Sequence, residues 1–234
     1  MILYGILGAG GFAREVMPLV QQQVAKEHGS GTYKCAFVLE DDYPITEKYI
    51  NGVEVISLTE FLSTNCDQRY FNIAISKSEA RERISKMIPA SLAKPFSITA
   101  ATHIALANNQ VGEGGFFAHF THITSNIKIG KFFHSNIGCI IGHDCIIGDY
   151  VTLGPDVKCN GWVRIEDHAY IGAGAIIKDG TDKPIVIGKG AVVGMGAVVT
   201  KSVPPGVTVV GNPAKPLTNQ PARRHLEVVE VASA

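Results

Sequence analysis

The sequence is poor in charge and has no excess of either sign. Only 18% of its 234 residues are Asp, Glu, Lys or Arg, and 21 basic residues balance 21 acidic ones. Proteins whose main activity is to bind nucleic acid or an acidic membrane surface carry basic patches. We therefore expect neither nucleic acid nor a membrane among the partners.

Two further absences narrow the class of protein. The five cysteines, at positions 35, 66, 139, 145 and 159, form no CxxC pair, and their odd number argues against a disulfide framework. No apolar run approaches the length of a membrane-spanning helix. Residues 1–7 lack the basic start and the cleavage site of a signal peptide. These features predict a cytoplasmic protein whose thiols stay reduced.

From about residue 105 onward the chain repeats every six residues. An aliphatic or small residue recurs in unbroken register, and the register resumes after a four-residue interruption at 181–184. The positions are Val111, Phe117, Ile123, Ile129, Ser135, Ile141, Ile147, Leu153, Cys159, Ile165, Ile171 and Ile177, then Ile187, Val193 and Val199. Each unit is one short strand plus a corner, too small to bury its apolar side alone, so neighbouring turns must stack on it.

Three units make a coil of eighteen residues, and this period predicts which residues lie above one another. Stacked strands lie about 4.8 Å apart. His143 should therefore lie between Ser125 and Gly161, and His134 should stack on Thr152. The repeated residue points inward, and the glycine that often follows it lets the chain turn without a side-chain clash.

Residues 1–98 alternate strand and helix patterns, which predicts a small parallel α/β sheet of Rossmann-like form. We expect strands at 1–7, 33–39, 53–56, 70–75 and 94–98, and helices at 12–28, 57–62 and 78–88. The chain thus divides into an α/β domain at 1–98, a β-helix domain at 99–217 and a C-terminal tail at 218–234. Two interpretations of the tail remain: a short helix or strand against a neighbouring subunit, or a segment without fixed structure.

A glycine-rich turn, with Gly8, Gly10 and Gly11, joins the first strand to the first helix. Ligands of parallel sheets favour the carboxyl ends of the strands, where backbone N–H groups can hold a phosphate. The turn is not a full GxGxxG, and a tight connection without a ligand is an equal interpretation. After the second strand, Glu40 and Asp41 either accept hydrogen bonds from a ribose or a base, or form a solvated acidic loop.

Three segments taken together carry a resemblance that covers nearly the whole chain: ILGAGGFAREV, IGHDCIIGDYVTLGPDVKCNGWVRI and VVGNPAKPL. In this order they resemble the sialic-acid O-acetyltransferase-like family, in its branch of bacterial nucleotide-sugar N-acetyltransferases. The resemblance implies a left-handed β-helix that holds acetyl-CoA and an α/β domain that holds a nucleotide-linked amino sugar. It also implies a homotrimer with active sites between subunits.

The family's catalytic signature, a histidine followed by an acidic residue, falls here on His143 and Asp144. A protonated amine cannot attack a thioester until a base removes a proton, and histidine has the side-chain pKa nearest to neutrality. A neighbouring carboxylate fixes the tautomer and stabilises the imidazolium. Asp144 replaces the Glu of some relatives and has a shorter reach. Where some members place a second histidine this chain has Thr152, so no second histidine is assigned.

The resemblance and the eighteen-residue period together suggest the rest of the acetyl-CoA site. The backbone N–H of Gly161, stacked on His143, is expected to polarise the acetyl carbonyl as an oxyanion donor. Ala173 and Met195 are expected to line the pantetheine slot. Lys201 and Lys215 are expected to meet the CoA phosphates as point charges.

On the sugar side, Asn136 matches a polar position that relatives use near the sugar. Ser76 and Lys77 follow a strand at another carboxyl-end loop, where they either contact the nucleotide or are ordinary polar loop residues. Three functions remain open at this point. They are N-acetylation of a nucleotide-linked 4-amino-4,6-dideoxy sugar for a bacterial surface glycan, which we favour, O-acetylation of a sugar such as sialic acid, and a non-catalytic nucleotide-binding scaffold. The sequence does not select among uridine, thymidine and guanosine diphosphates as the carrier.

The remaining histidines and cysteines suggest no other chemistry. No histidine pair has the five-residue spacing of the trimeric β-helix carbonic anhydrases, so we expect no metal. His122, His134 and His168 are expected on the outer faces of the β-helix. Cys159 should point into the core and Cys145 has no assigned base partner, so we expect direct acetyl transfer without an acyl-enzyme.

Overall fold

A six-stranded sheet with three helices forms the first part of the chain, in a computed structural model that describes residues 1–29, 31 and 33–217. The strands are β1 (Ile2–Leu7), β2 (Tyr33–Leu39), β3 (Tyr49–Ile50), β4 (Val53–Ser57), β5 (Gln68–Ile73) and β6 (Lys94–Pro95). The helices are α1 (Gly11–His28), α2 (Leu58–Ser63) and α3 (Ser78–Met87). The strand order is β3-β4-β2-β1-β5-β6, and every pair is parallel except the β3–β4 hairpin. The Rossmann-like parallel α/β sheet predicted from the sequence is thus confirmed.

The expected strand at 94–98 was wrong, because two different sheets share this segment. β6 pairs with β5 in the α/β sheet, whereas Ile98 already belongs to β7 (Ile98–Thr99), which pairs with β10 of the solenoid. Buried Asn72 donates to the carbonyls of both Phe96 and Gly114, and Ser97 Oγ accepts from Gly115 N. These side-chain hydrogen bonds fix the backbone where the chain leaves the α/β sheet and enters the β-helix.

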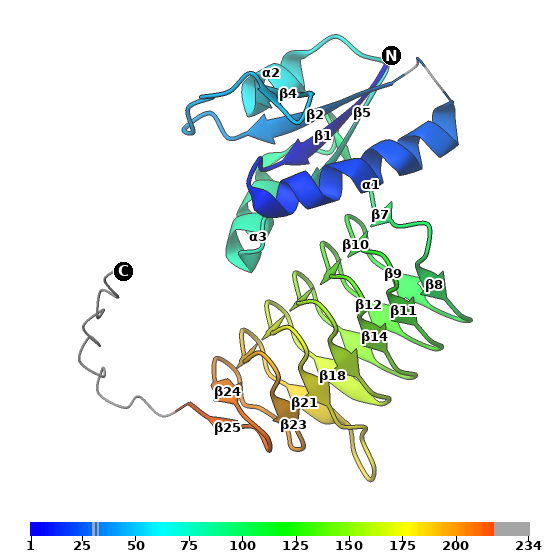
Figure 1. Ribbon diagram of the computed structural model, residues 1–234, viewed down its shortest axis with the longest axis vertical. Helices are drawn as coiled ribbons and strands as arrows, with labels where there is room; N and C mark the ends of the chain where they lie inside the picture. The colour runs from blue at the N-terminus through cyan, green and yellow to red at the C-terminus, as the bar shows by residue number, and fades with distance from the viewer. Residues whose placement is uncertain (30, 32, 218–234) are drawn as a thin grey trace, which may run out of the picture.

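The second part is the left-handed parallel β-helix, a prism with three faces of short strands (Figure 1). The first face contains β7 (Ile98–Thr99), β10 (Phe116–Phe117), β13 (His134–Ser135), β16 (Thr152–Leu153), β19 (Tyr170–Ile171), β22 (Val192–Val193), β24 (Thr208–Val210) and antiparallel β25 (Lys215–Pro216). The second face contains β8 (Ile104–Ala105), β11 (His122–Ile123), β14 (Ile140–Ile141), β17 (Lys158–Cys159), β20 (Ile176–Ile177) and β23 (Val198–Val199). The third face contains β9 (Gln110–Val111), β12 (Lys128–Ile129), β15 (Ile146–Ile147), β18 (Val163–Ile165) and β21 (Ile185–Ile187).

The chain turns a corner between successive faces, and we name the three rows of corners by the faces they join. In one coil, residues 136–139 form the first corner, between the first and second faces. Residues 142–145 form the second corner, between the second and third faces. Residues 148–151 form the third corner and return the chain to the first face.

The six-residue register builds the core of the prism. Its residues from Phe117 to Val199 are buried, whereas Val111 in the first coil is 43% exposed. The glycines that follow these residues in sequence are needed for close contact between coils more than for the turn of the chain. A Cβ on Gly142 would lie 2.5 Å from Gly161 N in the next coil. The left-handed backbone falls two residues later, as at Asp144 with φ 60°.

Helices α1 and α3 join the α/β domain to the first face and third corner of the prism (Figure 1). Arg81 of α3 is fully buried and donates through Nη2 to Tyr150 O and Thr152 Oγ1, and through Nη1 to Ile75 O and Ser76 O. Burial lowers the pKa of its guanidinium to about 10. The sequence pattern did not reveal this clamp, since an arginine on a polar helix is ordinarily exposed.

The three histidines expected on the outer faces of the β-helix all point away from its core, but only His122 is exposed to solvent. His134 is 2% exposed because Phe12 of α1 and Phe116 enclose its ring. His168 stacks on Tyr150, with a centroid distance of 5.3 Å, and its Nε2 lies 3.2 Å from Glu82 Oε2. Both point outward from the prism but are covered by the α/β domain. No helix among the described residues is long and apolar enough to cross a membrane.

Candidate active site

His143 and Asp144 form a hydrogen-bonded pair at the second corner, between β14 and β15. Their Nδ1 and Oδ2 atoms are 2.8 Å apart, and the side chains are 68% and 51% exposed. The hydrogen bond from His143 lowers the pKa of the Asp144 carboxyl. When Asp144 accepts from Nδ1–H, the lone pair of Nε2 is left for a reacting proton. The shorter reach of Asp is therefore sufficient for this partnership.

Gly161 lies one coil further on, against the imidazole of His143, as the eighteen-residue period predicted. A Cβ on Gly161 would lie 2.6 Å from His143 Nε2. Trp162 N donates to His143 O at 2.8 Å and Gly180 N donates to Gly161 O at 3.0 Å. Within the described chain the N–H of Gly161 itself has no hydrogen-bond partner. The second corner thus combines a free imidazole nitrogen with a free backbone donor.

The other residues expected around the acetyl group and the sugar lie on a different row. Asn136, Ala173 and Met195 follow strands of the first face and so belong to the first corner. Met195 is 79% exposed, and Gly196 N donates to Ala173 O at 2.8 Å, which stacks these two coils. One chain therefore does not bring this row to His143, because the second face separates the two corners.

Of the two expected CoA lysines, Lys201 follows β23 and lies on the second corner, in the same row as His143. Lys215 lies on β25 at the far end of the prism. Both side chains are exposed, as a phosphate ligand requires.

The α/β domain contains a cavity of about 330 Å³ at the carboxyl ends of its strands. Gly8, Glu40 and Lys77, all expected site residues, line it. Tyr43 and Arg83 also line it and were not anticipated, because neither belongs to a recognisable motif. The cavity floor is apolar, formed by Leu7, Val38, Leu39, Ile75, Ala80 and Ile84.

The neighbouring polar residues are largely engaged within the protein. Glu40 accepts two hydrogen bonds from Arg83. Asp41 accepts from Thr59 N at 3.1 Å and Thr59 Oγ1 at 2.9 Å, and these bonds lower the pKa of its carboxyl. Ser76 does not line the cavity, and its carbonyl accepts from the Arg81 clamp. Asp41 ties the β2–β3 connection to α2 through these bonds, and its side chain remains exposed.

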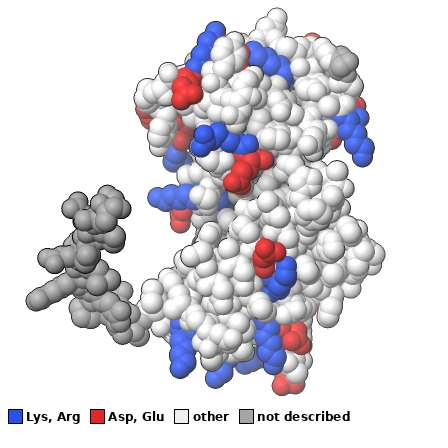
Figure 2. Space-filling view, viewed as in Figure 1, with Lys and Arg blue, Asp and Glu red and all other residues white. Residues whose placement is uncertain are grey.

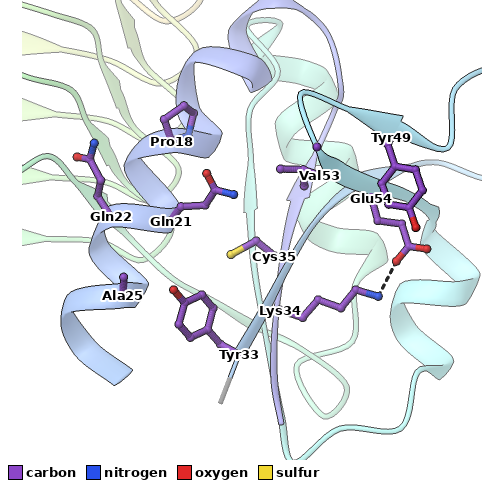
Figure 3. A pocket seen from close by; sticks show the side chains of 11 residues that line it. Pro18, Gln21, Gln22, Ala25, Tyr33, Lys34, Cys35, Tyr49, Val53 and Glu54 are labelled. Carbon is purple, nitrogen blue, oxygen red and sulfur yellow. Dashed lines mark hydrogen bonds and ion pairs between the residues drawn. The ribbon is translucent and has the colours of Figure 1, made fainter. Parts of the chain in front are cut away.

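A larger groove, of about 790 Å³, lies between α1, the start of β2 and the β3–β4 hairpin (Figure 3). It contains none of the expected site residues. Lys34 and Glu54 pair across its floor at 2.5 Å, and burial raises the pKa of Cys35 to about 11. Positive and negative side chains are interspersed over the face of the molecule in Figure 2, without one basic patch.

Two features bear on alternative chemistry. Within the part of the chain that the structure describes, no group of three or more His, Cys, Asp or Glu residues is arranged to hold a metal ion. Cys139, Cys145 and Cys159 are buried, and burial raises the pKa of the Cys139 thiol. The thiols of Cys145 and Cys159 both donate to Asn160 O inside the prism. All three thiols therefore lie inside the prism, and none of them is exposed at the second corner.

Comparison with known proteins identifies both parts of the chain. Residues 5–88 match the PglD N-terminal domain family, and residues 162–201 match the hexapeptide repeat of succinyl-transferase. A GDP-perosamine N-acetyltransferase of Escherichia coli O157:H7 is 46% identical over 222 residues, which cover 94% of this chain and 99% of the relative. The chain belongs to the nucleotide-sugar N-acetyltransferase family.

Solved structures agree with this N-acetyltransferase assignment. WeeI from Acinetobacter baumannii AYE is 49% identical and superposes with a TM-score of 0.86 over 93% of this chain and 100% of that one. The acetyltransferase domain of PglB from Neisseria gonorrhoeae FA1090, in complex with acetyl coenzyme A, is 26% identical, with a TM-score of 0.78 over 92% of this chain and 98% of that one. The protein is an acyltransferase, and the family expectation from the sequence is confirmed.

Proposed function

We propose that this N-acetyltransferase moves the acetyl group of acetyl-CoA to the 4-amino group of a nucleotide-linked 4-amino-4,6-dideoxy sugar, with GDP-perosamine as the first acceptor to test. The observation that carries the proposal is the second corner, where Asp144 holds His143 through Nδ1 and leaves Nε2 free for the reacting proton. The 46% identity to a GDP-perosamine N-acetyltransferase supports the acceptor. The gonococcal structure with acetyl coenzyme A supports the donor.

In the proposed reaction, the sugar amine attacks the thioester carbonyl carbon while His143 Nε2 takes a proton from the nitrogen. Asp144 accepts from Nδ1–H and stabilises the imidazolium that forms. The N–H of Gly161 donates to the developing oxyanion, an effect worth roughly 3 kcal/mol when such a donor is lost. The C–S bond then breaks, and His143 returns its proton to the sulfur, so CoA leaves as a thiol.

We further propose that the site is completed across the boundary of a homotrimer. On the second face Ile104, Ile140 and Ile176 point outward, between 37% and 47% exposed, with His122 and Lys158 between them. Exposed apolar side chains grouped on one face favour a contact surface. If three second faces surround the three-fold axis, the first corner of one subunit meets the second corner of its neighbour. Asn136 and the acetyl-CoA row then face His143 of another chain.

We place the acetyl-CoA molecule at that boundary. The backbone N–H groups of Ala173 and Met195 have no partner within the described chain and can donate to the amide carbonyls of pantetheine. Lys201 and Lys215 lie further along the prism, where the phosphates of CoA would reach. We propose both lysines as ligands of the CoA phosphates because of their position and their positive charge.

The nucleotide is proposed to lie in the 330 Å³ cavity of the α/β domain. The backbone of Gly8, Gly10 and Gly11 leads into the N-terminus of α1, where N–H groups can hold a diphosphate. Lys77 adds a positive charge at the wall of the cavity, and Ser76 precedes it on the same loop. Both substrates are cytoplasmic metabolites, so we place the enzyme in the cytoplasm and its product in the assembly of a bacterial surface glycan.

The test is release of CoA thiol with a panel of UDP-, dTDP- and GDP-linked 4-amino sugars, with the product identified by mass spectrometry. We expect turnover with a 4-amino sugar and its loss in His143→Ala. The variant Lys128→Ala removes an exposed side chain of the third face, which lies outside the proposed subunit boundary, and is a control for general effects on the prism. Turnover only with a hydroxyl acceptor such as sialic acid would reassign the enzyme to O-acetylation. Binding of nucleotide without any acetyl transfer would indicate a non-catalytic nucleotide-binding scaffold.

A further inference from the structure

One wall of the 330 Å³ cavity in the α/β domain is the loop between β5 and α3, residues 74–77. Ile75 and Lys77 of this loop line the cavity. A Cβ on Gly8 would lie 3.2 Å from both Ala74 O and Ile75 Cγ1, so the glycine turn lies directly against the loop. A nucleotide held between the glycine turn and this loop therefore moves with the loop.

The Arg81 clamp joins that loop to the prism. Its Nη1 donates to Ile75 O at 3.0 Å and Ser76 O at 2.8 Å, and within the described residues no other donor reaches these two carbonyls. Its Nη2 donates to Tyr150 O and, at 2.8 Å, to Thr152 Oγ1. A guanidinium is a planar fork with fixed angles between its N–H groups, so the two pairs of acceptors are held at one separation.

The prism end of the clamp belongs to a rigid body that also carries the candidate base. Tyr150 N donates to Lys131 O at 2.9 Å in the preceding coil. Thr152 N donates to Ala169 O at 3.1 Å in the following coil. His143 lies at the preceding corner of the same turn of the prism. A loop clamped here keeps a constant separation from His143 of its own prism and, in the proposed trimer, of the neighbouring prism.

We propose that Arg81 is a positioning residue for acetyl transfer, because it sets the separation between the nucleotide cavity and the prism. The inference deepens the proposed function and rests on it. A sugar whose nucleotide is held in the cavity reaches His143 Nε2 only if that separation matches its length. Reacting atoms must approach to about 3–3.5 Å, and a misplacement of about 1 Å can lower the rate about a hundredfold. Arg81 is fully buried and does not line the cavity, so it acts without touching either substrate.

The competing explanation is that Arg81 only holds the two domains together. Other contacts between the domains do this without the loop. Ser85 Oγ and Tyr150 OH lie 2.9 Å apart, and Asn72 donates to Gly114 O at 3.1 Å. These contacts remain when Arg81 is replaced, so the domains should stay docked. Ser85→Ala is the matched control, since it removes a hydrogen bond between α3 and the prism and leaves the loop in place.

The kinetic arm compares Arg81→Lys, Thr152→Val and Ser85→Ala with wild type, using the best nucleotide-linked acceptor and saturating acetyl-CoA. Lysine keeps the charge but not the fork, so Arg81→Lys should lower kcat at least about tenfold, with the acceptor KM within about threefold. Thr152→Val keeps the shape of the side chain and removes one acceptor, so it should fold and lower kcat about fivefold. Ser85→Ala should stay within about twofold of wild type. Full kcat in either clamp variant, or an equal loss in Ser85→Ala, would overturn the proposal.

Transfer to the free 4-amino-4,6-dideoxy sugar, which has no nucleotide, is a readout that a purely structural role would not spare. This acceptor reaches the prism without the cavity, so its slow acetylation should have the same rate in wild type and Arg81→Lys. An equal loss with the free sugar would indicate damage to the prism itself and would refute the positioning role.

The spectroscopic arm needs no acetyl transfer and so separates this inference from the proposed function. Trp162, the one tryptophan of the sequence, lies beside Gly161 on the prism. Time-resolved energy transfer from Trp162 to mant-labelled GDP, UDP or dTDP in the cavity measures the separation and its spread. We expect a wider spread in Arg81→Lys and Thr152→Val than in wild type and Ser85→Ala. An unchanged spread, or no binding of any of the three nucleotides, refutes the positioning role even if acetyl transfer is confirmed. A wider spread supports it even if the acceptor proves to be a hydroxyl.

Discussion

Replacement of Gly161 by alanine is expected to separate catalysis from folding. The added Cβ would lie 2.6 Å from His143 Nε2, 2.7 Å from Cε1 and 3.0 Å from Cδ2. Carbon contacts are optimal at about 3.5–4.0 Å, so the imidazole must move by about 1 Å to accommodate the methyl group. The ring is 68% exposed and can move into solvent, and the backbone of Gly161 lies outside the left-handed region. The strain is therefore relieved by displacing the base.

A displacement of about 1 Å can reduce the rate of an enzymatic step about a hundredfold. We expect Gly161→Ala to lower kcat by roughly this factor, measured by thiol release with the best acceptor of the panel. The midpoint of thermal unfolding, followed by circular dichroism, should stay within about 3 °C of wild type, because the close contacts of the new methyl group are with an exposed side chain that can move.

Gly142→Ala is the contrasting variant. Its Cβ would meet backbone atoms, 2.5 Å from Gly161 N and 2.7 Å from Asn160 C, and backbone in the stacked coils cannot move aside. We expect this variant to unfold at a clearly lower temperature. The reasoning fails if Gly161→Ala keeps its kcat, or if it loses as much thermal stability as Gly142→Ala.

Three further outcomes follow from the described contacts. Arg81→Met leaves buried carbonyls without a donor and should lower the free energy of unfolding, measured in urea, by roughly 3 kcal/mol. Arg83→Met, at the exposed rim of the cavity, should lower it by less than about 1 kcal/mol. Equal losses in the two variants would contradict the role of Arg81 as a clamp between the domains. Hydrogen bonds from Thr59 hold the pKa of Asp41 below its ordinary 3.8, so this stabilisation is present above about pH 4 and is lost as the pH falls through the lower folded value. The unfolding temperature of Asp41→Asn should then fall less than that of wild type between about pH 5 and pH 3, and parallel curves would refute a stabilising contact between Asp41 and Thr59. Trp162 is the one tryptophan of the sequence and adjoins Gly161, so its fluorescence should change on titration with acetyl-CoA in wild type and in His143→Ala, and a silent titration would place the cofactor elsewhere.

Periodicity predicted most of the fold because each strand of the prism is local in sequence. Gly161 lies against His143 as the eighteen-residue spacing requires, and the strand at Tyr33–Leu39 agrees with its apolar pattern. Contacts between the two domains followed no such pattern. His134 was expected outside because its register position points away from the core, but α1 covers it and burial lowers its pKa well below the usual value.

The candidate site was predictable in composition but not in arrangement. The signature located His143 and Asp144, and the structure shows their bond directly. Asn136 is only seven residues from His143 in sequence, which suggests that the two lie close together. One face of the prism lies between them, however, so they belong to different corners. The engagement of Asp41 by α2 was equally invisible, because it depends on how a loop folds back on a helix 18 residues later.

The placement of site residues on two different corners has a genetic consequence. In the proposed trimer each chain contributes its first corner to one active site and its second corner to another. A chain defective only at His143 still carries an intact partner for its neighbour, and so does a chain defective only at Asn136. A mixed trimer of the two would contain one boundary at which both contributions are whole. Two inactive alleles of this gene could thus restore part of each other's activity, although neither encodes a working enzyme alone.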